Sequence, residues 1–204
     1  MSAALPERKP WPMKWIVVAI LVVIVPYTFL TLHYRKPGPA FRPYEDMKSR
    51  ANTLRLLSAG YQRIALNATR PAIPSAIGSA APIAAASGGL PAALKSTLVE
   101  TPLLPAEILN VTAASTASAS TAYSIQFTCT LPDNKQQLAG AELYVRGTEI
   151  IITPDFEKLS GGLLTRTREN IILLTVPDGV LKPGRYHVTL AGQHASRTWT
   201  LQVK

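Results

Sequence analysis

The stretch YSIQFTCTL, residues 123–131, predicts the fold class of the C-terminal half of this 204-residue chain. Apolar residues from Tyr123 to Leu131 alternate with serine, glutamine and threonine at every step. Because successive side chains of a strand point to opposite faces of a sheet, this alternation indicates a strand with one face buried. We therefore predict that the strand packs on a hydrophobic core. Cys129, the only cysteine, should be a buried structural thiol without a disulfide partner.

Similar runs continue on both sides of this strand. Turn signals such as Pro177-Asp178-Gly179 separate them. They predict further strands at residues 108–111, 141–146, 149–153, 163–165, 170–176, 185–191 and 196–203. Many short strands with closely spaced turns, within roughly 100 residues, are typical of an antiparallel β-sandwich. We therefore predict that residues 97–204 form an all-β sandwich domain.

Residues 181–186, LKPGRY, give this prediction a more specific form. They resemble the tyrosine corner of immunoglobulin-like and fibronectin type III-like sandwiches, where a tyrosine early in a strand bonds the backbone just upstream. The resemblance implies that Tyr186 is such a structural tyrosine, and that Cys129 and Val188 take the places of the two conserved cysteines. It implies a fold only, with no catalytic residue or ligand. An ordinary turn before a strand would give the same sequence.

Two apolar runs in the predicted sandwich lack the alternation, at residues 150–152 and 171–174. A strand of a sandwich exposes one face to solvent unless another element covers it. These runs are therefore either a contact surface for a partner or central strands covered by neighbouring loops.

The segment at residues 72–96, AIPSAIGSAAPIAAASGGLPAALKS, consists almost entirely of alanine, proline, serine and glycine. Such a composition offers little apolar side-chain area to bury. Its burial would not offset the conformational entropy lost when the segment becomes ordered. We predict that residues 72–96 form a flexible tether.

Residues 44–67, within a juxtamembrane segment at residues 35–71, show a helical period. Apolar residues recur there at steps of three and four, which places them on one face of an amphipathic helix. The residues of this face are Met47, Ala51, Leu54, Leu57, Tyr61 and Ile64. The basic residues beside it are Lys48, Arg50, Arg55 and Arg63.

A single helix of this length cannot bury its apolar face alone, so a partner must cover it. Three partners fit the pattern: a second membrane protein, the acyl boundary of the bilayer, or a second copy of the same helix. We therefore predict that the residues of this helix, apolar and basic, form a membrane-interface or partner-contact surface.

The preceding stretch WIVVAILVVIVPYTFLTL, residues 15–32, contains no charged residue. Extended to Tyr34, at ~1.5 Å rise per residue, it spans ~30 Å, the thickness of the hydrocarbon core of a bilayer. We predict a transmembrane helix at residues 15–34, after a basic tail at residues 1–14. A cleaved signal peptide is the alternative, but its apolar core is usually shorter, and no small-residue cleavage site follows directly.

The net charge of +9 is confined to the N-terminal half of the chain. Residues 1–97 contain 12 Lys/Arg and 3 Asp/Glu, whereas residues 98–204 contain nine of each kind. Because these charges flank a predicted membrane helix, anionic lipid is a nearer partner than nucleic acid, for which no fingerprint is present.

The Lys/Arg count favours a cytoplasmic C-terminal domain. However, a short basic tail before an apolar run is also how signal-anchors begin, and we expect the domain outside the cytoplasm, in the periplasm.

No catalytic or metal-binding pattern accompanies this architecture. His33, His187 and His194 lack the spacing that would place two imidazoles on one face. Asp155, like the other aspartates of the domain, lies in a predicted turn. We therefore expect no cofactor and no metal.

The expected function follows from this architecture. We expect a non-enzymatic, single-pass membrane protein that serves as an accessory or scaffolding subunit for a membrane-protein partner. The alternative is a membrane-tethered module of the cell envelope that binds a glycan or a peptide.

Overall fold

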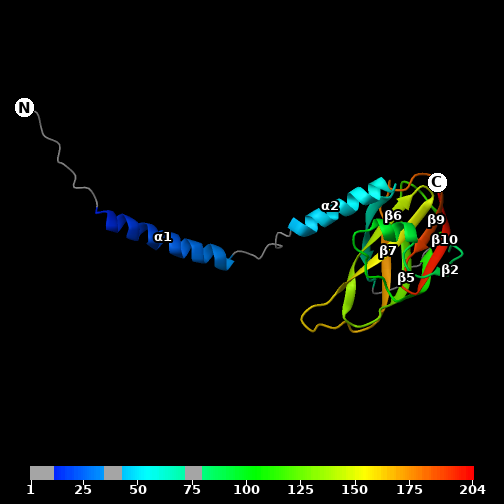
Figure 1. Ribbon diagram of the computed structural model, residues 1–204. Helices are drawn as coiled ribbons and strands as arrows, with labels where there is room; N and C mark the ends of the chain where they lie inside the picture. The colour runs from blue at the N-terminus through cyan, green and yellow to red at the C-terminus, as the bar shows by residue number, and fades with distance from the viewer. Residues whose placement is uncertain (1–11, 35–42, 72–79) are drawn as a thin grey trace, which may run out of the picture. The chain divides into compact units, whose positions relative to one another are not determined.

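The computed structural model describes residues 12–34, 43–71 and 80–204, which are coloured in Figure 1. The chain divides into two compact units, Met1–Pro43 and Tyr44–Lys204. One described element, helix α1, belongs to the first unit. All other elements lie in the second unit, apart from the first residue of α2.

Helix α1 spans Met13–Tyr34 and has no buried side chain. It is the only helix among the described residues that is long and apolar enough to cross a membrane. A membrane anchor and a signal sequence both meet this criterion. Pro26 lies inside the helix without ending it. Most of the predicted basic tail and the segment at residues 35–42 lie outside the described residues.

The second unit consists mainly of strands. Its helices are α2, Pro43–Ser58, and α3, Ala92–Thr97. Its strands are β1 Gln62–Thr69, β2 Ala84–Ser87, β3 Glu107–Ala113, β4 Thr116–Ala117, β5 Tyr123–Thr130, β6 Gln136–Arg146, β7 Glu149–Lys158, β8 Glu169–Val176, β9 Gly184–Leu190 and β10 Ala195–Val203. The predicted strands correspond to β3 and β5 to β10, except residues 163–165, which lie in a loop.

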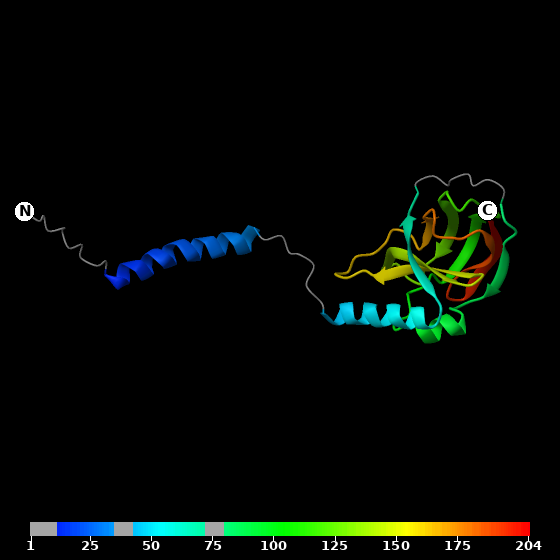
Figure 2. The same ribbon diagram turned by 90° about the horizontal axis from the view of Figure 1, so that it is seen from above.

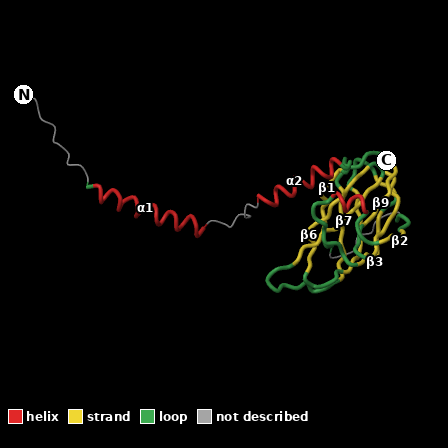
Figure 3. Tube along the Cα trace, in the orientation of Figure 1, coloured by secondary structure: helices red, strands yellow, loops and turns green. Residues whose placement is uncertain are grey.

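All of these strands belong to one mixed sheet (Figures 1 and 3). The strand order is β2-β10-β9-β7-β6-β1-β8-β5-β3, with β4 beside β10. Most neighbours are antiparallel, whereas the β7–β9 and β10–β4 pairs are parallel. The sheet curls strongly into a half-barrel, as Figure 2 shows from a second direction. The predicted sandwich of two sheets is therefore wrong, and so is the resemblance to immunoglobulin-like domains.

The predicted helix at residues 44–67 is wrong in its second half, because α2 ends at Ser58. Gly60 adopts a left-handed backbone conformation with φ of 79°, which glycine reaches without a steric penalty. The Tyr61 amide donates to the Leu56 carbonyl at 2.8 Å, and the Gly60 amide donates to the Leu57 carbonyl at 3.0 Å. These two bonds form a Schellman motif, which terminates a helix.

The chain continues from this motif as β1, which joins two groups of strands into one sheet. Residues 62–66 pair with β6, and residues 67–69 pair with β8. Ile64, Leu66 and Ala68 alternate toward the main core. Without β1, strands β8, β5 and β3 would form a separate sheet, as in a sandwich.

The predicted tether at residues 72–96 is also wrong where the structure describes it. Strand β2 pairs with β10, and α3 buries Leu94 completely. Gly88 approaches the backbone of His194 so closely that a Cβ atom would lie 2.2 Å from it. The glycine therefore serves close packing rather than flexibility. The folded unit begins at Tyr44 instead of residue 97, and residues 72–79 lie outside the described residues.

The main hydrophobic core lies inside the curled sheet. Phe127 on β5 and Leu143 on β6 are both buried in it, although they come from opposite groups of strands. Trp199 Nε1 donates to Tyr123 Oη at 3.2 Å, between strands that are not neighbours in the sheet. Cys129 is fully buried in the same core, which confirms the predicted structural thiol. Burial raises its pKa to about 12.

Two hydrogen-bonding side chains lie on the neighbouring strands β9 and β10. The Tyr186 hydroxyl donates to the Lys182 carbonyl at 3.0 Å, the bond that the tyrosine-corner resemblance implies, here in a different fold. The Arg197 guanidinium on β10 donates to the carbonyls of Ile108 at 3.1 Å and Leu109 at 3.3 Å on β3. Arg197 thus bridges the open side of the half-barrel.

A second hydrophobic cluster lies on the outer face of the sheet, where α2 and α3 cover β6 and β7. Its members are Leu56, Tyr61, Leu94, Leu98, Tyr144 and Ile151. The apolar run at residues 150–152 is therefore a covered central strand rather than a contact surface. In the run at residues 171–174, Ile172 and Leu174 are fully buried and the other two side chains are half-buried.

Truncation of Leu66 tests the role of β1 in the core. Leu66 is 7% exposed, so Leu66→Ala should lower the free energy of unfolding by about 2–5 kcal/mol. Leu57→Ala, at an exposed position of α2, should change it by about 0.5 kcal/mol or less. Urea denaturation of the full chain in mild detergent, followed by circular dichroism, measures both. Equal losses at the two positions would contradict the assignment of residues 62–69 to a core strand.

Candidate functional site

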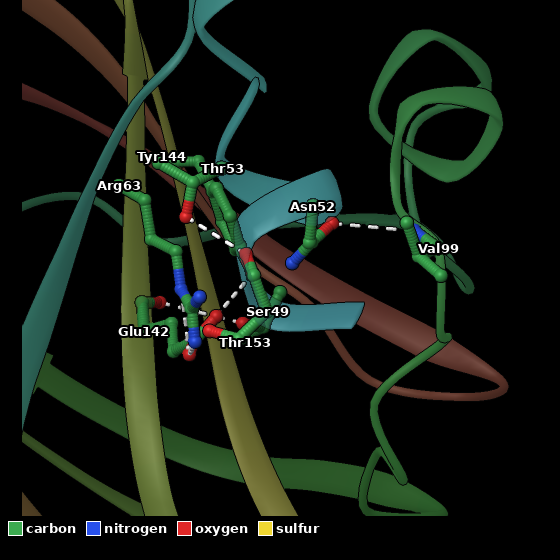
Figure 4. Close-up of polar contacts among 8 residues, drawn as sticks. All are labelled: Ser49, Asn52, Thr53, Arg63, Val99, Glu142, Tyr144 and Thr153. Carbon is green, nitrogen blue, oxygen red and sulfur yellow. Dashed lines mark hydrogen bonds and ion pairs between the residues drawn. The ribbon is translucent and has the colours of Figure 1, made fainter. Parts of the chain in front are cut away.

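A polar cleft of about 460 Å³ lies beside α2 on the outer face of the sheet. It is lined by α2, by the segment at residues 98–103, and by β1, β6 and β7. Figure 4 shows the polar side chains at its centre. The charged residues of the lining are Lys48, Arg63, Glu100, Glu142, Asp155, Glu157 and Lys158.

Strand register brings the central polar side chains together. Arg63 on β1 lies opposite Tyr144 on β6, and Glu142 on β6 lies opposite Thr153 on β7. Because side chains two residues apart on a strand share a face, Asp155 lies on the same face as Thr153. The alternation directs the intervening residues into the main core. It places Arg63, Glu142, Tyr144 and Asp155 in the lining of the cleft, with the buried Thr153 beneath Glu142.

Glu142 is the centre of this arrangement (Figure 4). Its carboxylate accepts a hydrogen bond from Arg63 Nε at 2.9 Å and a second from a terminal guanidinium nitrogen of Arg63. It also accepts one from the Tyr144 hydroxyl. Thr153 Oγ1 donates to the Glu142 backbone carbonyl at 3.4 Å. Because donors from both Arg63 and Tyr144 reach its carboxylate, Glu142 orders the centre of the cleft.

The surroundings of Tyr144 and Arg63 keep both groups in their donor forms. Burial, together with the hydrogen bond to Glu142, raises the pKa of Tyr144, because both disfavour the phenolate. The hydrogen bond to Glu142 also raises the pKa of Arg63, because it favours the charged guanidinium. Arg63 and Tyr144 are therefore fixed donors to the Glu142 carboxylate.

Asp155 is the second carboxyl group at the centre of the cleft, and it is half-buried. Its pKa is raised, first by burial and then by the nearby charge of Glu142, while the backbone amides of Leu103 and Phe156 act in the opposite direction. A carboxyl group held where its charge is disfavoured is a common feature of functional sites.

Two contacts hold α2 against the segment at residues 98–103. Asn52 Oδ1 accepts a hydrogen bond from the Val99 amide at 3.2 Å (Figure 4). Lys48 Nζ lies 3.5 Å from Glu100 Oε2. The cleft is therefore part of the folded unit and has defined walls.

The structure separates the predicted contact residues into two sets. On α2, Met47, Leu54, Leu57 and Arg55 are exposed, whereas Lys48 lines the cleft. The predicted apolar residues that lie on α2 are therefore exposed and point away from the domain to which the helix belongs.

The remaining predicted residues follow the end of the helix and belong to the sheet. Tyr61 is buried in the outer cluster, beneath the Arg146 guanidinium, whose central carbon lies 4.6 Å from the centroid of the ring. Ile64 packs on the main core, and Arg63 points into the cleft. A single contact face that includes all of them is therefore wrong, because the motif at Gly60 ends the helix.

Sequence reasoning missed Glu142, Tyr144 and Asp155. It assigned Asp155 to a predicted turn after the strand expected at residues 149–153. Strand β7 nevertheless continues to Lys158. The signal that could have identified these residues is their alternation with apolar neighbours on β6 and β7, which places polar groups of adjacent strands on one face.

The described residues of the cleft provide charges and hydrogen-bonding groups but include no histidine and no cysteine. Within residues 12–34, 43–71 and 80–204, no group of three His, Cys, Asp or Glu side chains could hold a metal ion. His187 and His194 are exposed outside the cleft lining. Most of the residues that line the cleft are charged or polar.

No protein-family model, curated protein or solved structure matches this chain.

The pH dependence of stability tests the environment of Asp155. Below the ordinary carboxyl pKa of 3.8, Asp155 is neutral in both the folded and the unfolded chain. As the pH rises, Asp155 ionises first in the unfolded chain, because its pKa is higher in the folded chain. The free energy of unfolding therefore falls until Asp155 is charged in both states. Asp155→Asn should therefore raise the thermal midpoint at pH 7 and leave it nearly unchanged at about pH 3.

Asp178→Asn, in the exposed turn before β9, is the matched control for loss of one carboxylate. Thermal scans of both variants at the two pH values are compared with the unsubstituted chain. A gain at Asp155→Asn that is no larger than that of the control, or that persists at the lower pH, would refute the proposed environment.

Proposed function

We propose that this chain is a non-enzymatic, single-pass membrane protein whose β domain serves as an accessory or scaffolding subunit for a membrane-protein partner. The observation that carries the anchoring is α1, a 22-residue helix with no buried side chain. Its length matches the hydrocarbon core of a bilayer, and Trp15 and Tyr34 suit the two interfaces. An uncleaved helix of this kind keeps the domain at the membrane.

The cleft beside α2 supports the second half of the proposal. Arg63 and Glu142 are already paired, so the centre of the cleft is ordered before a partner arrives. Its lining carries charges of both signs, including the exposed Glu157 and Lys158. Preorganised mixed charges favour selective contact with a complementary protein segment, because a mismatched charge is strongly disfavoured.

We further propose that the domain lies outside the cytoplasm, in the periplasm. The support is the short basic tail before α1, with Arg8, Lys9 and Lys14, which is typical of signal-anchors that keep their N-terminus in the cytoplasm.

One observation favours a second function, that of a membrane-tethered module for a peptide or glycan ligand. An adjoining cleft of about 600 Å³ lies between residues 88–90, Lys95 of α3, residues 101–104 and the start of β6. Gln136 lines it, is buried, and has a side-chain oxygen without a hydrogen-bond partner among the described residues. An unpaired buried carbonyl can accept a hydrogen bond from a ligand. This function requires a small ligand at Gln136 rather than a protein at the first cleft.

Attachment and orientation are measured together with fusions after Lys204. A fusion of the full chain to alkaline phosphatase should be active and should stay in the membrane after alkaline carbonate extraction. A fluorescent protein that folds only in the cytoplasm should stay dark at the same position. A cleaved N-terminus in the intact mass, or release by carbonate, would exclude the anchor. Fluorescence without phosphatase activity would reverse the proposed orientation.

A photo-crosslinking amino acid at Thr101, an exposed residue of the cleft lining, tests the partner contact. In intact cells it should give one discrete adduct with a membrane protein. The same group at Lys182, exposed in the turn before β9, should give none. Glu157→Lys should reduce the Thr101 adduct by at least about fivefold, because it places a like charge against the partner. Adducts at both positions, or at neither, would rule out the cleft as the contact site.

A further inference from the structure

The most exposed large apolar side chains of the second unit are concentrated on two elements. Among the described residues of this unit, those more than 60% exposed are Met47 at 64%, Leu54 at 68%, Leu57 at 61%, Leu163 at 64% and Leu164 at 63%. The first three lie on α2, and the last two lie in the loop between β7 and β8. Grouped exposure of this kind marks an interaction surface.

Helix α2 has two apolar sides, and the fold of its own domain uses only one. Leu56 is buried and packs with Tyr61 and Tyr144 in the outer cluster. At 3.6 residues per turn, Met47 and Leu54 lie on nearly the same side of the helix, roughly opposite Leu56. Docking of α2 on the sheet therefore does not explain the side that Met47 and Leu54 form.

The loop at residues 159–168 also carries apolar side chains that the domain itself does not cover. Gly161 and Gly162 have positive φ angles of 72° and 77°, which allow the chain to turn sharply just before the two leucines. Neither Leu163 nor Leu164 belongs to a hydrophobic cluster of the unit. Figures 1 and 2 show that this loop and the N-terminal end of α2 extend beyond the sheet on the same side of the unit.

We propose that these five side chains form a lipid-contact surface that rests in the interface of the bilayer crossed by α1. This inference rests on the membrane anchoring proposed above. Only eight residues separate Tyr34 from Pro43, and a segment of that length spans at most about 30 Å. So short a connection holds the surface at a high effective concentration near the headgroups, so that weak individual contacts suffice.

The charges around this surface fit anionic headgroups. Arg50 and Arg55 are exposed on α2, and Arg166 is exposed two residues after Leu164. No carboxylate occurs between Met47 and Ser58 or within residues 159–168. Arginine can lay its aliphatic stem along the apolar boundary while its guanidinium binds phosphate, which suits an amphipathic surface on a membrane.

Fluorescence of the full chain in vesicles tests this surface. Leu54→Cys and Leu163→Cys are introduced one at a time and labelled with a nitrobenzoxadiazole fluorophore. The unsubstituted chain corrects for reaction at Cys129, which is fully buried. In vesicles of phosphatidylcholine with ~30% phosphatidylglycerol, nitroxide-labelled acyl chains should quench both labels by at least about twofold. The emission of both labels should also shift to the blue. Lys182→Cys, at an exposed turn, should show neither effect.

Flotation of the vesicles separates failure of the anchor from failure of this inference. A chain that floats but carries an unshifted, unquenched label at either position overturns the lipid-contact surface and leaves the anchor intact. A blue shift without quenching by the lipid nitroxides indicates contact with a second copy and also overturns it. Equal quenching in vesicles of pure phosphatidylcholine would overturn the part assigned to anionic headgroups.

Discussion

The pairing of β1 with two different neighbours is the interaction on which the second unit depends. Residues 62–66 complete the sheet on the β6 side, and residues 67–69 continue it on the β8 side. A single strand thereby converts two groups of strands into one curved surface around one core. The same strand places Arg63 on the outer face, where it meets Glu142. The floor of the cleft and the closure of the core are therefore set by the same eight residues of β1.

Features that depend on local pattern could be predicted from the sequence. The alternation in residues 123–131 predicts β5 and the burial of Cys129, because a strand with one buried face needs no knowledge of its neighbours. The apolar run at residues 15–32 predicts a helix for the same reason, because its length and lack of charge are local properties. The hydrogen bond of Tyr186 also forms within one turn, so it could be anticipated even though the fold around it was wrong.

Features that depend on distant pairing could not be predicted in this way. The apolar steps from Met47 to Ile64 fit a helix, yet Gly60 is the residue that decides where the helix ends, because it permits the Schellman motif. Nothing in residues 62–69 specifies which strands they join, and a sandwich differs from this half-barrel chiefly by that pairing. The alanines of β2 gave no strand signal of their own, since their order comes from pairing with β10. Glu142 and Asp155 likewise meet only through the register of β6 and β7.

The two surfaces proposed for this chain meet at α2, and its geometry relates them. Asn52 ties the helix to the cleft wall through Val99, whereas Met47 and Leu54 lie on a different side of the same helix. The exposed apolar side of α2 suits lipid, whereas Lys48 and Asn52 on the side toward the domain line the cleft that suits protein. If the apolar side rests in the bilayer, the same helix holds the cleft that it lines near the headgroups. A protein held at the same membrane is then within reach of the cleft, as the proposed function requires. The placement of α2 therefore makes the membrane-protein partner and the lipid-contact surface mutually consistent parts of one arrangement.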